Sequence, residues 1–97
     1  MRMALSIIHL ALATLLGLAG TLAASGEPEQ AAELFGATIA NYESAGIVMF
    51  AGERLEFERD RAIVGEALDE ETLARAWRRG QEMKLEQAIE YALACGT

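Results

Sequence analysis

Histidine is almost missing from this chain of 97 residues. The only one, His9, lies in an apolar segment at the N-terminus. Beyond that segment there is no imidazole for Ser-His-Asp or Cys-His nucleophilic catalysis, or for the common histidine-containing metal sites. The carboxylates form no Asp-x-Asp-x-Asp-Gly calcium loop either. The sequence therefore predicts a protein that is not an enzyme and that holds no metal or cofactor.

Cysteine is equally scarce, since Cys95 is the only one. A single cysteine excludes the intrachain disulfides on which many small exported domains depend. One interpretation is an intermolecular disulfide through Cys95, because an odd cysteine in an exported protein suggests pairing between chains. The other is a small apolar side chain that closes the last helical turn.

Basic residues are few: the chain has eight, against 15 acidic ones, and a net charge of −7. Nucleic-acid binding depends on clustered lysine and arginine, and attraction to anionic membrane surfaces depends on the same charges. We therefore expect neither nucleic acid nor an anionic lipid surface as a ligand.

A long run of residues near the N-terminus carries no charge. Arg2 is followed by residues 4–24, which are uncharged and largely apolar, and small residues cluster up to Gly26. This pattern is typical of a signal peptide, here residues 1–26, and predicts a periplasmic or extracellular protein. Residues 4–24 are also long enough to span a membrane. The alternative is therefore an uncleaved anchor in the inner membrane.

Residues 27–97 form one small domain of 71 residues that keeps all 15 acidic and seven of the basic residues, which gives a net charge of −8. A domain of this size is marginally stable alone. Apolar residues at helical spacing predict a first helix over 27–45, with Pro28 in its first turn and Gly46 at its end. We expect an all-α fold, an up-down bundle of about three helices after the apolar leader.

The middle segment, residues 47–68, is ambiguous. Its apolar residues fit one face of a helix, and residues 53–61 are good helix formers. However, residues 47–50 are β-branched and aromatic, and residues 55–58 alternate with period two. A helix is favoured because an isolated hairpin is weak. The alternative is an α+β fold with a hairpin at 47–59.

The last segment, residues 69–95, reads as a helix that begins at the N-cap Asp69. Gly80 interrupts it, and marks either a kink that splits the helix or a point of close approach by another helix. Trp77 is flanked by Arg78 and Arg79, and these residue types dominate binding hot spots. The alternative is that Trp77 anchors the core.

Taken together, these features predict a small, exported, acidic, helical protein that acts by protein binding or self-association. Its partner is then another protein or a second copy of the chain. If the leader is uncleaved, the alternative is a membrane-anchored accessory subunit with residues 4–24 as the spanning helix.

Overall fold

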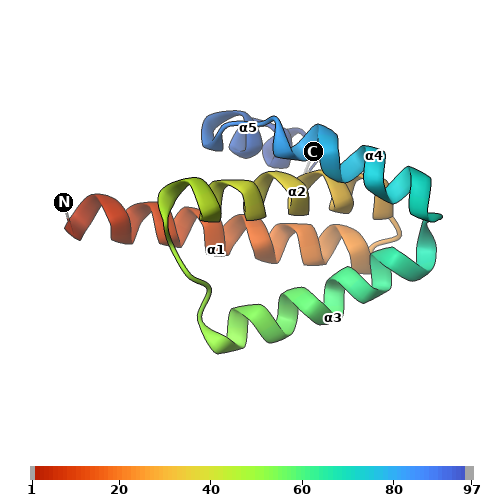
Figure 1. Ribbon diagram of the computed structural model, residues 1–97, viewed down its shortest axis with the longest axis horizontal. Coiled ribbons are helices and arrows are strands. Elements are labelled where there is room, and N and C mark those ends of the chain that lie inside the picture. The colour runs from red at the N-terminus through yellow and green to blue at the C-terminus, as the bar shows by residue number, and fades with distance from the viewer. Residues whose placement is uncertain (1, 96–97) are drawn as a thin grey trace.

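The computed structural model describes residues 2–95, with side chains from residue 6 onward, and this part of the chain is all helical. Its five helices are α1 (Arg2–Ala24), α2 (Pro28–Ala45), α3 (Ala51–Ala67), α4 (Glu70–Gln81) and α5 (Leu85–Cys95). Figure 1 shows α1 and α2 side by side, with α3 below them and α4 and α5 above in this view. The predicted all-α class is confirmed. The predicted count of about three helices after the leader is wrong, because there are four.

The apolar leader forms α1, which packs along α2 and also contacts α3 and α5. One stripe of α1 is buried in the common core, and it consists of Leu12, Leu15, Leu16, Ala19 and Ala23. The window Ser6–Ala24 is long and apolar enough to cross a membrane, with a mean hydropathy of 2.0, yet only 28% of it is buried by the rest of the protein. By length and composition, α1 therefore fits a signal peptide or a membrane anchor.

Helix α2 is the central element and contacts the four other helices. It begins at Pro28 and ends where Gly46 adopts the left-handed conformation, with φ of 69°. The backbone N–H of Gly46 donates to the Glu43 carbonyl at 3.1 Å, and that of Ile47 donates to the Tyr42 carbonyl at 3.0 Å. These bonds satisfy the last carbonyls of the helix. The predicted end is confirmed, with Gly46 as the stop, and the helix begins one residue after the predicted start.

The segment after α2 contains no hairpin: residues 47–50 form an irregular loop, and α3 follows. The backbone N–H of Phe50 donates to the Glu53 carboxylate at 2.8 Å. This contact supports the first turn of α3, because an acidic side chain near a helix N-terminus is favourable. The favoured helix is confirmed from residue 51 to residue 67, and the α+β alternative is wrong.

The last predicted helix is broken in two between Gln81 and Leu85. At the break, the Asn41 side-chain amide of α2 donates to the freed carbonyl of Met83 at 3.0 Å. The Gln87 side chain then accepts from the backbone N–H of Lys84 at 2.8 Å and caps the start of α5. Two side chains thus replace the backbone bonds that one continuous helix would have made.

Gly80 is the penultimate residue of α4 and lies at the crossing of α4 and α2. A Cβ at this position would overlap the Glu33 carbonyl oxygen and lie 2.8 Å from the Ala37 nitrogen. Gly36 has the reciprocal role, since a Cβ there would overlap the Trp77 carbonyl oxygen. The two glycines therefore allow α2 and α4 to touch backbone to backbone.

Candidate functional site: a hollow beside Trp77

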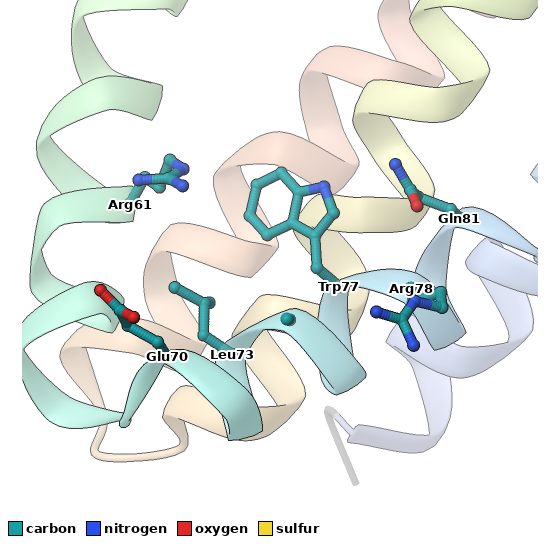
Figure 2. A pocket seen from close by; sticks show the side chains of 7 residues that line it. Arg61, Glu70, Leu73, Trp77, Arg78 and Gln81 are labelled. Carbon is teal, nitrogen blue, oxygen red and sulfur yellow. The ribbon is translucent and has the colours of Figure 1, made fainter.

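A shallow surface hollow of about 390 Å³ lies between α3 and α4 (Figure 2), and we call it the Trp77 hollow. Its lining residues are Arg61 from α3, and Glu70, Leu73, Ala74, Trp77, Arg78 and Gln81 from α4. Figure 2 shows Arg61 pointing toward the indole ring, with Glu70 and Leu73 at one end and Gln81 at the other.

Trp77 is half-buried and belongs to both the core and the hollow. Its ring stacks on Phe35 of α2 at a centroid distance of 6.2 Å, with 22° between the planes. Its centroid is also 6.2 Å from that of Phe57 in α3. Because aromatic packing from two other helices holds the ring, its exposed edge is presented in a fixed orientation. Trp77 can therefore both anchor the core and take part in a binding surface, which are the two interpretations that the sequence left open.

Two arginines, Arg61 and Arg78, line the hollow together with Trp77. The Arg61 Cζ lies 5.5 Å from the Trp77 ring centroid, within the range of a cation–π interaction. Neither Arg61 nor Arg78 has a carboxylate within 4.0 Å among the described residues. Glu70 is the one acidic side chain in the lining. The hollow therefore carries a net positive charge in a chain whose overall charge is −7.

Arg79, which the sequence groups with Trp77 and Arg78, lies outside the hollow. Its Nη2 is 2.7 Å from the Glu33 Oε1, and its Nε donates to the same oxygen at 2.8 Å. Glu29 is a second partner at 3.7 Å. Hydrogen bonding to Glu33 raises the pKa of the Arg79 guanidinium. Arg79 thus ties α4 to α2, while Trp77 and Arg78 share the hollow.

Cys95 is half-buried as a free thiol at the end of α5. It lies beside a recess of about 220 Å³ whose other walls include Leu18 and Leu22 of α1 and Ala92 of α5. The proposed disulfide to another chain stays a prediction.

His9, which the sequence assigns to the leader, joins α1 to α3. Its Nε2 lies 3.1 Å from the Glu53 Oε1, and its ring centroid is 4.5 Å from that of Phe50. The ring of Tyr42 meets it edge-on at 6.0 Å. Burial, followed by the negative charge of Glu53, raises the pKa of Tyr42 to about 12. Assigning His9 to a removable leader left no reason to expect this cluster.

In the described part of the chain, no group of three or more His, Cys, Asp or Glu side chains is placed to hold a metal ion. What the Trp77 hollow offers is recognition chemistry, with guanidinium donors, an aromatic edge and an amide. No known protein family, characterised protein or solved structure matches this chain. The site is therefore interpreted from its own geometry.

Sequence reasoning missed Arg61 as a member of the site. Arg61 lies 16 residues before Trp77 and in a different helix, so no spacing rule within one helix connects the two residues. The available signal was the amphipathic pattern of residues 47–68, which places Arg61 in line with Phe57 and Val64.

Proposed function

We propose that this chain is a small, exported, acidic helical protein that binds a protein partner, and that the Trp77 hollow receives an acidic side chain from that partner. The observation that carries the proposal is that Arg61 and Arg78, which have no carboxylate within 4.0 Å among the described residues, line one hollow with the only tryptophan of the chain. Charge-assisted hydrogen bonds from arginine to a carboxylate are among the strongest polar contacts at protein surfaces.

The dimensions of the hollow support a side-chain ligand. Its volume of about 390 Å³ is near the lower end of the range for small-molecule pockets, about 300–1,000 Å³. Trp77 and its arginine neighbours are the residue types in which binding energy concentrates. The acidic surface elsewhere repels acidic segments that do not place a carboxylate in the hollow. The net positive lining of the hollow thus favours a partner that places a carboxylate there.

Because Trp77 is the only tryptophan and lines the hollow, its fluorescence is a probe of binding there. We expect a glutamate-rich octapeptide to change this emission in a saturable way, and the matched glutamine peptide to have no effect. The double variant Arg61→Gln/Arg78→Gln should bind the acidic peptide at least tenfold more weakly. The control Arg59→Gln/Arg75→Gln, outside the hollow, should bind as the parent does. Equal loss in both double variants, or equal binding of both peptides, contradicts the proposal.

The proposed location is the periplasm or the extracellular space, supported by the apolar window Ser6–Ala24 of α1 near the N-terminus. The second candidate function is an accessory subunit anchored in the inner membrane, with residues 4–24 as a spanning helix. It is favoured by the length and mean hydropathy of the Ser6–Ala24 window, of which only 28% is buried within the bundle. The intact mass of the native protein distinguishes the two. Loss of about 2.5 kDa, the expected mass of a signal peptide, excludes the anchor, and a full-length mass together with resistance to alkaline extraction from membranes supports it.

A further inference from the structure

The Trp77 hollow carries charges of both signs along its length. Six of its seven lining residues belong to α4 and recur at helical spacing, at positions 70, 73, 74, 77, 78 and 81. Residues three and four apart share one face of a helix, so these six form a continuous stripe from the first residue of α4 to its last. The seventh comes from α3, and none comes from α1. The stripe is therefore a feature of α3 and α4 alone.

Glu70 lies at one end of this stripe, and Arg78 lies toward the other end (Figure 2). Eight positions separate the two residues, which is a rise of about 12 Å along the helix at 1.5 Å per residue. Neither side chain has an oppositely charged group within 4.0 Å among the described residues. The lining between them is apolar or aromatic and consists of Leu73, Ala74 and Trp77. The stripe is thus acidic at one end, apolar in the middle and basic toward the other end.

We infer that the acidic segment received by the hollow also carries one basic side chain, which pairs with Glu70. The inference rests on the proposed function, because it places the carboxylate of the same segment at the Arg78 end. Arg61 does not take the place of that basic group, since its guanidinium lies over the Trp77 ring and makes no ion pair with Glu70 within 4.0 Å. A purely acidic segment would bring a further carboxylate close to Glu70, and juxtaposed like charges act against binding.

The separation of the two ends specifies the spacing of charges in an extended segment. Such a segment rises about 3.3 Å per residue and directs alternate side chains to the same side. A span of about 12 Å along α4 therefore corresponds to four residues of the segment. Its basic and acidic side chains are then four positions apart, with an apolar side chain midway that faces Leu73 and Trp77. Because the segment can lie in either direction along the stripe, the spacing is specified and the order is not.

Glu70 is thereby a specificity-determining residue of the hollow. The net charge of −7 attracts any basic peptide, so the contact with Glu70 has to be separated from this general attraction. Glu71 provides the matched control, because it is exposed in the same first turn of α4 and lies outside the lining. Glu70→Gln and Glu71→Gln change the net charge by the same amount, and both side chains are exposed, so neither substitution should disturb the packing.

The test is a titration of the full-length chain with three octapeptides, followed by Trp77 fluorescence. The peptides have blocked ends and differ only in a central segment: Lys-Ser-Leu-Ser-Glu, Gln-Ser-Leu-Ser-Glu, or the isomer Ser-Ser-Leu-Lys-Glu with the charges adjacent. We expect the first peptide to bind the parent two- to fivefold more tightly than the other two, as an exposed ion pair would produce. Glu70→Gln should bind all three equally, and Glu71→Gln should keep the preference of the parent.

A parent without this preference, a preference that survives in Glu70→Gln, or an equal loss of preference in Glu71→Gln overturns the inference. The glutamine peptide separates such a failure from a failure of the proposed function. It should bind the parent and bind the Arg61→Gln/Arg78→Gln variant at least tenfold more weakly. If it does so while the lysine adds nothing, the hollow receives a carboxylate and only the role of Glu70 is overturned. If none of the peptides binds the parent, both proposals are overturned.

Discussion

At the scale of single residues, Gly36 and Gly80 determine how closely two helices approach. At each of these positions the backbone of the other helix is so close that a side chain would not fit. A glycine inside a helix costs roughly 1 kcal/mol relative to alanine. The gain is the close packing of α4 on α2, which places Trp77 between Phe35 and Phe57.

Gly80→Ala should therefore destabilise the protein although alanine is the better helix former. Its Cβ would meet backbone atoms of Glu33 and Ala37, which cannot rotate away, and overpacking of this kind costs about 1–3 kcal/mol. Gly65→Ala is the matched control, because nothing lies within 4 Å of a Cβ at this exposed position of α3. The control should gain about 0.5–1 kcal/mol. Urea unfolding measures both, and a stabilised Gly80→Ala protein contradicts the described crossing.

Tyr42 carries an unsatisfied group: its hydroxyl oxygen is buried without a hydrogen-bond partner in the described part of the chain. Removing such a hydroxyl while keeping the ring relieves a desolvation cost, which is about 1–3 kcal/mol for an unsatisfied buried polar group. Tyr42→Phe should therefore be at least as stable as the parent at neutral pH. A clear loss of stability in urea unfolding shows that the hydroxyl has a partner.

Both tyrosines should resist ionisation in the folded protein. The pKa of Tyr42 is raised to about 12, and burial, followed by hydrogen bonding to Glu33, raises that of Tyr91 further. A folded-state pKa above the unfolded value of about 10 contributes stability that is complete below pH 10 and is lost as the pH rises beyond it. Ultraviolet titration should show tyrosinate appearing together with unfolding, and near pH 10 when urea is present. Ionisation at pH 10 without unfolding contradicts this burial.

Several residue roles are predictable because they depend on local chemistry. Gly46 as a helix stop and Asp69 as an N-cap follow from backbone rules that hold within a few residues of chain. The contacts of Arg61 with Trp77 and of His9 with Glu53 join different helices. Their prediction requires the packing angles of those helices, which no local rule provides.

At the scale of elements, α4 depends on its N-terminal cap. The Asp69 carboxylate accepts from the Thr72 backbone N–H at 2.7 Å, and hydrogen bonding from Thr72 lowers the pKa of Asp69. A lowered pKa contributes stability that is present above the unfolded value and is lost as the pH falls through the folded one. The cap should therefore weaken only in acid.

Asp69→Asn should keep the cap, since asparagine is an equally good N-cap residue, and should remove this contribution to the acid sensitivity. Asp69→Ala should lose the cap at every pH. Thermal unfolding followed by circular dichroism at neutral pH and in acid compares the three proteins. Equal melting temperatures for Asp69→Ala and the parent at neutral pH would show that the cap is not needed.

The division of the last segment into α4 and α5 could not be predicted from the local sequence pattern. Residues 69–95 carry a continuous apolar stripe, and the local pattern alone favours one helix. At the break, the side-chain amide of Asn41, 42 positions before Met83 in the chain, donates to the freed carbonyl of Met83, and no local pattern reveals this contact. For Gly80 the sequence left open a kink or a close approach by another helix; the structure shows the close approach to α2 at Gly80, and the break begins after Gln81.

At the scale of the whole molecule, α1 is part of the core. It contributes three of the largest apolar side chains that are buried, Leu12, Leu15 and Leu16. Burying one leucine stabilises a fold by about 1.5–3 kcal/mol, so the three together are comparable with the total stability of a small domain, about 5–15 kcal/mol. Hydropathy alone identifies α1 as apolar and does not show which face meets α2.

A chain that begins at Glu27 should therefore be only partly folded. We expect a broad, low-temperature melt and binding of a hydrophobic dye, because the face of α2 that α1 covers becomes exposed. The full-length chain should melt cooperatively and bind little dye at its core. A cooperative melt at the same temperature for both chains would show that α1 is not required. If the leader is removed in the cell, a partner or a second copy must cover that face.

The central claim is that the Trp77 hollow binds an acidic segment of a partner protein. The most direct measurement places a photoreactive residue at position 74, inside the hollow, with position 51 as an exposed control outside it. After irradiation in the native compartment, mapping of the crosslinked peptides should locate the adducts from position 74 in an acid-rich segment of one protein. These adducts should be lost in the Arg61→Gln/Arg78→Gln variant and be absent from position 51. The same adducts from both positions, adducts that survive the double substitution, or no adduct at all would contradict the claim.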